Sequence, residues 1–193
     1  MNKWDERYQG EDFFFGTEPH EFLLQIQNHL PTAGRALDLA TGEGRNGIFL
    51  AQLGLNAEGV DQSAVGIAKA RRLAELKGVA FEARVADINE MAMPPEHYAV
   101  ISSVYCHFAE PERSVLAQKI IRALSGGGLF VGVFYHPEQA DLPIGPSDVA
   151  MLADLETLQT TFDGLEWLAA EHRRSGEGDN ARSMVWLLGQ KPA

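Results

Sequence analysis

The apolar residues of this chain recur in short runs, and most of those runs have the composition of strands. Runs at residues 35–40, 56–61, 79–87, 98–104 and 129–135 predict five strands. The run at 98–104, YAVISSV, is continuous and rich in β-branched residues, which is typical of a strand buried on both faces of a sheet. The pattern therefore indicates a sheet whose centre is buried.

Segments with apolar residues at helical spacing lie between these runs. They predict helices over 19–30, 45–53 and 64–77, and a fourth helix that begins at Pro111 and ends before Gly126. Alternation of strand and helix is typical of a parallel sheet that helices cover on both faces.

The last third of the chain departs from this alternation. A helix is expected at 147–158, followed by strands at 166–174 and 183–189 that the turn-rich stretch SGEGDNA connects. Two consecutive strands with a short connection form an antiparallel hairpin. The expected fold is therefore α/β: one domain over 1–193, with a Rossmann-like, doubly wound sheet of seven strands. Five of these are parallel, two form the C-terminal hairpin, and helices lie on both faces.

The composition of the chain limits which classes of partner such a domain can bind. The 193 residues include 16 Lys and Arg against 27 Asp and Glu, a net charge of −11, which disfavours nucleic acid because phosphate binding needs a basic surface. The single cysteine, Cys106, excludes an internal disulfide and a multi-cysteine metal site, and no metal is expected. No apolar run approaches the roughly 18 residues that span a bilayer, and the start, MNKWDERYQGEDFFFG, is unlike a secretory signal. We expect a cytoplasmic monomer or homodimer with no membrane partner.

The most informative stretch is ALDLATGEGRNGIFLAQLG at 36–54, where a strand ends, a tight turn follows and a helix begins. Ligands of open parallel sheets bind beyond the carboxyl ends of the strands, and glycines such as Gly42 and Gly44 let the backbone approach them. Asp61 ends the next strand, 19 residues after Gly42, where a carboxylate can accept both hydroxyls of a ribose. The loop and Asp61 together predict a ligand that contains a nucleoside.

Residues 42–47 also read G-x-G-x-x-G, a pattern of dinucleotide binding that would make the chain an NAD-dependent oxidoreductase. Three details disfavour this alternative. Asp38 interrupts a strand that is usually apolar up to the glycines, and only 14 residues separate Gly47 from Asp61, where about 20 are expected. The terminal hairpin also leaves no second mononucleotide-binding half.

The loop Asp38–Gly44, together with Asp61 and with Asp87 after the third strand, resembles the class I S-adenosylmethionine-dependent methyltransferases. The step LSGGGLF at 124–130 and the expected hairpin resemble the same family, so the resemblance covers nearly the whole chain. One position departs from the family: Ala40 replaces the usual first glycine of the loop. We expect the backbone of Ala40 to avoid the left-handed conformation, and the loop to keep its ligand.

The first residues add a finer resemblance. The stretches WDERY at 4–8 and FFGTEP at 14–19 resemble the tellurite-resistance and thiopurine-type branch, whose acceptors are small molecules. The segment 1–18 also carries many aromatic residues, which could pack onto the domain or form a lid that excludes water from the cofactor.

The family resemblance implies a position for each part of S-adenosylmethionine and of its product, S-adenosylhomocysteine. Asp61 would bind the ribose hydroxyls, with Gln62 beside the adenine, and Asp87 would accept from the adenine amino group. Asp38 would organise the loop or reach the methionine amino group through water. The full set of implied cofactor-binding residues is Tyr8, Asp38, Ala40, Thr41, Gly42, Gly44, Arg45, Asn46, Asp61, Gln62, Asp87, Ile88 and Ser103.

Simpler explanations stay open for several residues. Asp61 and Asp87 could be turn or capping residues, as most aspartates at strand ends are. A basic cluster on the predicted helix at 64–77 is expected to form a solvated face; it consists of Lys69, Arg71, Arg72 and Lys77. Residues 137–160 begin with a stretch rich in proline and acids, which we expect to border the substrate entrance and to repel polyanions.

Tyr105, Cys106 and His107 follow the fourth strand, where the family places residues that face the acceptor. They are the catalytic and pocket candidates, although a lone histidine is usually structural and a lone cysteine is usually a small buried hydrophobe. We expect methyl transfer from S-adenosylmethionine to a small-molecule acceptor, such as a soft thiol or chalcogen nucleophile. An amine or hydroxyl would need a base, for which His107 is the first candidate. A non-catalytic module that binds S-adenosylmethionine or a nucleoside is the alternative, because no single residue is indispensable to methyl transfer.

Overall fold

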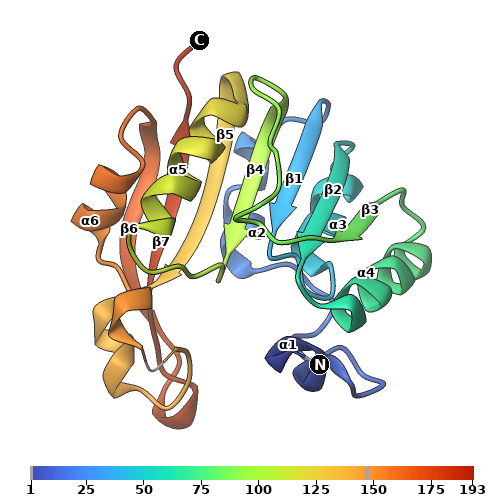
Figure 1. Ribbon diagram of the computed structural model, residues 1–193, viewed down its shortest axis with the longest axis horizontal. Coiled ribbons are helices and arrows are strands. Elements are labelled where there is room, and N and C mark those ends of the chain that lie inside the picture. The colour runs from blue at the N-terminus through green and yellow to red at the C-terminus, as the bar shows by residue number, and fades with distance from the viewer. Residues whose placement is uncertain (1, 147) are drawn as a thin grey trace.

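The computed structural model describes residues 2–146 and 148–193. One sheet of seven strands organises the molecule (Figure 1): β1 (Arg35–Leu39), β2 (Asn56–Asp61), β3 (Glu82–Val85), β4 (Tyr98–Val104), β5 (Leu124–Tyr135), β6 (Glu166–Ser175) and β7 (Arg182–Gln190). The strand order is β3-β2-β1-β4-β5-β7-β6. Strands β1 to β5 pair in parallel, whereas β7 pairs antiparallel with both β5 and β6. The α/β sheet with a C-terminal hairpin at one edge is confirmed.

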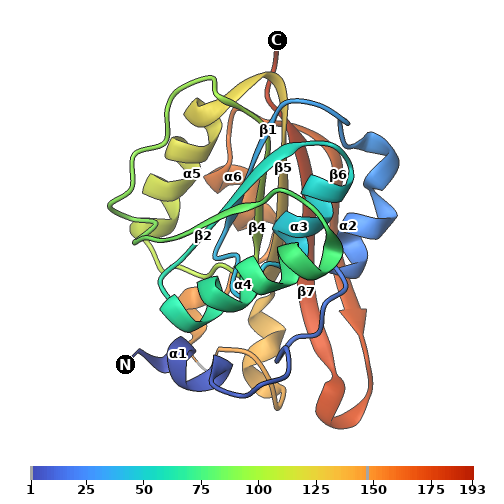
Figure 2. The same cartoon turned by 90° about the vertical axis from the view of Figure 1, so that its right-hand side faces the viewer.

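Helices cover both faces of this sheet (Figure 2). One face carries α2 (Glu21–Gln25), α3 (Arg45–Gln52) and α4 (Ala64–Lys77), and the other carries α5 (Glu112–Ala123) and α6 (Leu155–Thr161). Neighbouring residues of each central strand point to opposite faces, so Val100 packs in one core with Phe22 while Ile101 packs in the other with Leu116. The continuous apolar strands in the sequence thus reflect burial on both sides.

Shorter elements complete the fold. Helix α1 (Lys3–Tyr8) packs on α4, and four 3₁₀ helices lie in connections: η1 (Gln27–His29), η2 (Pro137–Asp141), η3 (Val149–Met151) and η4 (Gly178–Asn180). No helix in 2–146 or 148–193 is long and apolar enough to cross a membrane.

Several predicted boundaries are wrong. The expected helix at 19–30 ends at Gln25 and continues only as η1, and the expected strand at 79–87 is limited to β3 because Val79 and Phe81 pack beside α4 instead. Strand β5 begins at Leu124 rather than after the glycines. Leu124 already pairs with Tyr98 of β4, and the pairing resumes at Leu129 with Val100, so Gly126–Gly128 form an irregularity within the strand.

The expected helix at 147–158 is also wrong. Its place is taken by η3 and α6, because the Asp154 side chain accepts from the Thr157 backbone N–H at 2.8 Å and starts a new helix there. Position 147 lies outside the described residues.

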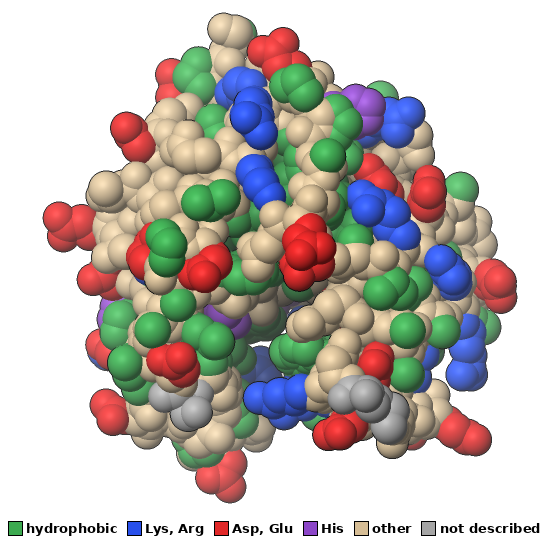
Figure 3. All heavy atoms as spheres, in the orientation of Figure 1, with side chains coloured by type: hydrophobic (Ala, Val, Ile, Leu, Met, Phe, Trp, Pro, Cys, Tyr) green, Lys and Arg blue, Asp and Glu red, His purple; other side chains and the backbone are tan. Residues whose placement is uncertain are grey.

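The carboxyl ends of β1 to β5 meet at one edge of the sheet, flanked by α1 on one side and by residues 137–146 and 148–151 on the other (Figure 1). Figure 3, in the same orientation, shows a hollow between these two lobes, bordered by Lys or Arg side chains. Strand order reverses between β1 and β4, which is where open parallel sheets bind ligands.

Candidate active site

The loop after β1 turns sharply through three residues with positive φ. They are Ala40 at +53°, Gly42 at +56° and Gly44 at +91°. Gly44 precedes α3, and a Cβ there would lie 2.8 Å from the Cβ of Ala70, so the loop and α4 can approach only if this residue is glycine. The loop has the tight geometry that the sequence predicts.

Ala40 contradicts the expectation that its backbone avoids the left-handed region. Its φ of +53° brings Cβ close to the backbone, a strain of roughly 1–2 kcal/mol that glycine does not have. The neighbouring contacts enforce this conformation, since the Thr41 N–H donates to the Val60 carbonyl at 2.9 Å.

We therefore expect Ala40→Gly to raise the free energy of unfolding by about 0.5 kcal/mol, as relief of strain exceeds the added entropy of the unfolded chain. Thermal denaturation measures this change. Ala36→Gly is the matched control: Ala36 is buried in β1 and lies in extended backbone, so its replacement should destabilise the chain. A destabilised Ala40→Gly variant would contradict the strain.

Asp38, in β1, holds the loop in place through hydrogen bonds to its carboxylate. Its carboxylate is fully buried and accepts from Thr41 Oγ1 at 2.6 Å, from the Gly47 N–H at 3.0 Å and from Ser102 Oγ at 2.7 Å. Burial outweighs these bonds and raises the pKa of Asp38 to about 6. Of the two roles left open by the sequence, these contacts favour organisation of the loop.

Asp61, the last residue of β2, links the end of that strand to the loop after β1. Its Oδ2 accepts from the Gly42 N–H at 2.9 Å and its Oδ1 accepts from the Ser63 N–H at 2.8 Å. The residue is only 6% exposed, and burial raises the pKa of its carboxyl. The structure thus brings Asp61 directly against the glycine loop, with lone pairs left on both oxygens.

The residues expected near the adenine lie at the neighbouring strand ends. The Ala86 N–H donates to the Asp61 carbonyl at 3.0 Å, so Asp87, the next residue, lies near the end of β2. Asp87 is exposed and accepts from the Asn89 N–H at 2.8 Å, so it also makes the turn contact of the simpler explanation. Ile88 is buried and Gln62 is exposed.

The N-terminal segment packs against this loop. The phenol of Tyr8 is so close to Gly42 that a Cβ there would lie 2.7 Å from its oxygen. Asp5 accepts from Ser63 Oγ at 2.7 Å, and the Asn2 side chain donates to the Gln62 carbonyl at 3.0 Å. Residues 2–8 thus cover the ends of β1 and β2.

Arg45 and Asn46 contact the same segment. The Arg45 guanidinium donates to the Phe15 carbonyl at 3.2 Å, and Asn46 Oδ1 accepts from the His20 N–H at 2.9 Å. In the structure, these two side chains therefore connect the start of α3 to the N-terminal residues.

Lys69 contradicts the expected solvated face. Its ammonium is buried, 2.8 Å from Glu43 Oε1, and donates to the Asp12 carbonyl at 2.6 Å. Arg71 is exposed, as expected, and donates to the Ala83 carbonyl of β3. Sequence reasoning missed Glu43 and Lys69 because their partners lie on different elements.

An aromatic stack lies beyond the carboxyl ends of β4 and β5. The rings of Tyr105 and Tyr135 stack with centroids 4.8 Å apart, and His107 stacks on Tyr135 at 5.2 Å. Tyr105 has φ +59°, a strained conformation for a bulky residue, and its hydroxyl lies 3.0 Å from His20 Nε2. No local pattern pointed to His20, because it is 85 residues from Tyr105 in the chain.

His107 differs from its neighbours in one respect. Both ring nitrogens are buried, and neither has a hydrogen-bond partner among the residues that the structure describes. Burial, with a smaller effect of the Arg113 charge, lowers the pKa of His107 to about 4, so the ring is neutral at pH 7.

Ser103 lies near the carboxyl end of β4, and Cys106 follows that strand. Both are buried, and burial raises the pKa of the Cys106 thiol to about 12. Cys106 therefore stays protonated, which does not fit a nucleophile or a metal ligand. Ser103 ends the stretch of β4 that pairs with β1.

The residues present fit the cofactor implied by the fold. Asp61 lies directly beside the glycine loop and offers free acceptor lone pairs there, as a ribose would require. Exposed Asp87 and Gln62 lie at the ends of the next strands, where an adenine would follow the ribose.

Known proteins are similar to this chain in sequence and in structure. Residues 36–128 match a family model described as a methyltransferase domain. A tRNA (uracil(54)-C(5))-methyltransferase from Pyrococcus abyssi is 28% identical over 129 residues, which are 65% of this chain and 30% of that protein. The chain thus spans about a third of the length of this curated relative.

Two solved structures share the fold. A S-adenosylmethionine-dependent methyltransferase from Methanosarcina mazei superposes with a TM-score of 0.73 and 16% identity, over 87% of this chain and 97% of that one. TehB from Haemophilus influenzae superposes with a TM-score of 0.75 and 19% identity, over 97% of this chain and 65% of that one. The TehB likeness is consistent with the branch resemblance of the first residues. Residues 36–128 are thus similar to a methyltransferase domain, and the sheet around them has the fold of S-adenosylmethionine-dependent methyltransferases.

Proposed function

We propose that the chain methylates a small-molecule acceptor with a soft thiol or chalcogen nucleophile, bound against Tyr105, His107 and Tyr135. The observation that carries this proposal is the pair of buried ring nitrogens of His107, which have no partner among the described residues. Buried polar atoms are nearly always hydrogen-bonded, and a bound acceptor would supply the missing contact.

The neutral state of His107 favours a soft acceptor. With a pKa lowered to about 4, the imidazole can accept a hydrogen bond at pH 7 but is a weak base. A thiol, with an ordinary pKa of about 8.5, loses its proton to water readily, whereas an alcohol needs a stronger base. Soft acceptors are thus the class that this pocket serves best.

S-Adenosylmethionine, held by the loop from Ala40 to Gly44 and by Asp61, would supply a methyl group on a positively charged sulfur, and the acceptor thiol would give its proton to water before accepting that methyl group in exchange for the sulfur of the cofactor. The residues of this chain align the acceptor and exclude water. The stacked rings of Tyr105 and Tyr135 provide the apolar wall, and His107 orients the nucleophile.

We assign the cofactor to the loop from Ala40 to Gly44, with its ribose on Asp61 and its adenine toward Asp87 and Ile88. The N-terminal residues would then form a lid over it. Support comes from Tyr8 against Gly42 and from the hydrogen bonds of Asp5 and Asn2 to the β2–α4 connection. Residues 137–160 would border the entrance on the other side of the hollow.

The tRNA methyltransferase relative raises a nucleic-acid acceptor as the competing possibility. The net charge of −11 opposes it, because a polyanion would need a compensating basic surface. The deciding measurement is release of S-adenosylhomocysteine by the purified chain with thiols, selenite, tellurite, thiopurines, amines and unmodified tRNA. Turnover with a thiol or chalcogen is expected; turnover with tRNA alone would overturn the proposal.

We expect His107→Leu to lower kcat/KM for the active thiol about tenfold or more, since it removes the two buried ring nitrogens that the proposed acceptor would contact. Leucine preserves the buried volume and removes two unpaired polar atoms, so Tm should stay constant or rise. Binding of S-adenosylhomocysteine, followed by calorimetry, should not change. His29→Leu, on exposed η1, is the control, and equal activity of the two variants would contradict the role of His107.

A further inference from the structure

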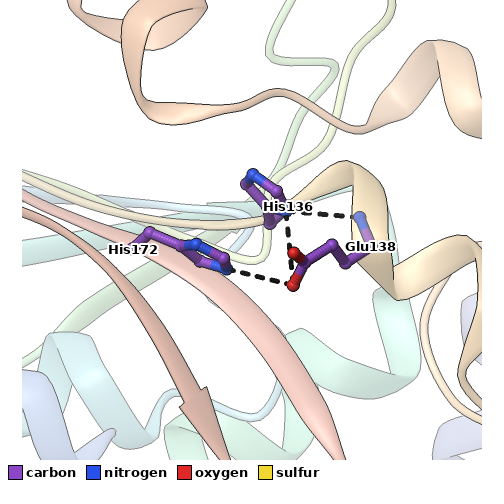
Figure 4. A group of neighbouring side chains, drawn as sticks. All are labelled: His136, Glu138 and His172. Carbon is purple, nitrogen blue, oxygen red and sulfur yellow. Dashed lines mark hydrogen bonds and ion pairs between the residues drawn. The ribbon is translucent and has the colours of Figure 1, made fainter.

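Three side chains of metal-binding type meet outside the residues proposed to contact the cofactor and the acceptor. His136 follows β5, Glu138 lies in η2 and His172 lies in β6 (Figure 4). One ligand atom from each residue lies within 4.8 Å of the other two. Glu138 Oε2 is 3.5 Å from His172 Nε2 and 3.9 Å from His136 Nδ1.

We propose that His136, Glu138 and His172 form a binding site for a divalent transition-metal ion such as Zn²⁺. Two ligand atoms about 2.1 Å from zinc lie about 3.4 Å apart at a tetrahedral angle. The observed separations of 3.5 and 3.9 Å from Glu138 Oε2 are close to this distance. Two imidazoles with one carboxylate favour a zinc-like ion over Ca²⁺ or Mg²⁺, which prefer oxygen ligands.

The two imidazole rings stack with centroids 3.9 Å apart and planes 17° from parallel. Lone pairs of parallel rings do not converge, so one ring must turn about its Cα–Cβ bond to bind the same ion. His172 is exposed on β6 and has room for this rotation, which replaces its 2.8 Å contact with Ser183 Oγ. His136 Nδ1 in turn exchanges its 3.2 Å bond from the Glu138 N–H for the ion.

The carboxylate of Glu138 already has outer partners that orient it. Arg174 Nε donates to Oε2 at 2.8 Å and Nη2 donates to Oε1, while Ser183 Oγ lies 2.9 Å from Oε2. An ion on Oε2 would displace Arg174 from that oxygen and leave it on Oε1. Arg174 is thus both an orienting residue and a competing cation, so its removal should strengthen metal binding.

An occupied site would connect η2 to β6 and would restrain the segment that borders the hollow. It would also lie beside the acceptor pocket, because Tyr135, which stacks on His107, directly precedes His136. Three protein ligands leave a fourth position of the ion open to water or to another donor. The inference does not depend on which acceptor the enzyme methylates.

Calorimetric titration of the untagged, chelator-treated chain with Zn²⁺ tests the site. We expect one saturable site per chain, a rise in Tm on binding, and the absorption bands of tetrahedral Co²⁺ when cobalt replaces zinc. Absence of saturable binding, or cobalt bands of a six-coordinate aqueous type, would overturn the proposal.

Matched variants locate the ion. His172→Gln should weaken Zn²⁺ binding about tenfold or more, whereas His29→Gln, at an exposed histidine of η1, should leave it unchanged. Arg174→Gln should bind Zn²⁺ more tightly than the unmodified chain, an effect that a simple surface ion pair does not predict. Equal weakening by both histidine variants, or weaker binding by Arg174→Gln, would place the ion elsewhere.

Discussion

Replacement of Asp61 with alanine is expected to weaken S-adenosylhomocysteine binding on the order of 100-fold. The proposed ribose contact consists of two hydrogen bonds to a buried carboxyl group, and their loss costs roughly 3 kcal/mol. The structure adds a second effect, because Asp61 also accepts from the N–H groups of Gly42 and Ser63 and so joins the loop to the β2–α4 connection. Isothermal titration calorimetry measures the affinity directly.

Glu58→Ala separates this contact from general damage to β2. Glu58 lies on the same strand and accepts from the Tyr98 hydroxyl at 2.6 Å, three residues before Asp61. We expect Glu58→Ala to lower Tm without changing the affinity for S-adenosylhomocysteine. Unchanged affinity in Asp61→Ala would show that the ribose lies elsewhere.

The second large effect is on stability. Asp38→Ala is expected to lower the free energy of unfolding by about 3 kcal/mol, because Thr41, Gly47 and Ser102 each lose an acceptor inside the core. Urea denaturation followed by circular dichroism measures the change. A loss no larger than that of a surface substitution would show that the loop does not depend on this carboxylate.

Asp38→Asn is the matched variant, and its effect should depend on pH. The amide can accept from Thr41 and Gly47 while donating to the Ser102 hydroxyl, so the network is preserved without the buried charge. The pKa of Asp38 is raised in the folded state to about 6 from an ordinary 3.8. Stability from this carboxyl is therefore fully present below pH 3.8 and is lost as the pH rises through about 6.

The Tm of Asp38→Asn relative to the unmodified chain should consequently increase between pH 4 and pH 7. A difference that stays constant over this range would show that Asp38 has an ordinary pKa. Both measurements are made without cofactor, since bound ligand would add its own stabilisation.

Local pattern was sufficient for the architecture of this chain. Strand and helix signals are periodic over a few residues, and alternation along the chain restricts the topology to a parallel sheet with helices on both faces. The glycine loop and Asp61 could also be placed, because a strand–turn–helix boundary and its spacing to the next strand end are local features. Boundaries failed where tertiary contacts decide them, as at Asp154, which starts α6 seven residues later than the start of the predicted helix at 147.

The chemistry of the side chains was decided only by the tertiary structure. The backbone of Ala40 has a strained, positive φ, Lys69 forms a buried ion pair with Glu43, and burial keeps the ring of His107 neutral. Each of these properties depends on desolvation and on partners tens of residues away, which no local pattern contains. The sequence determined where the carboxyl ends of the parallel strands meet. The packing around that edge determined which charged side chains are buried in pairs, which buried nitrogens lack partners and where a cation could bind.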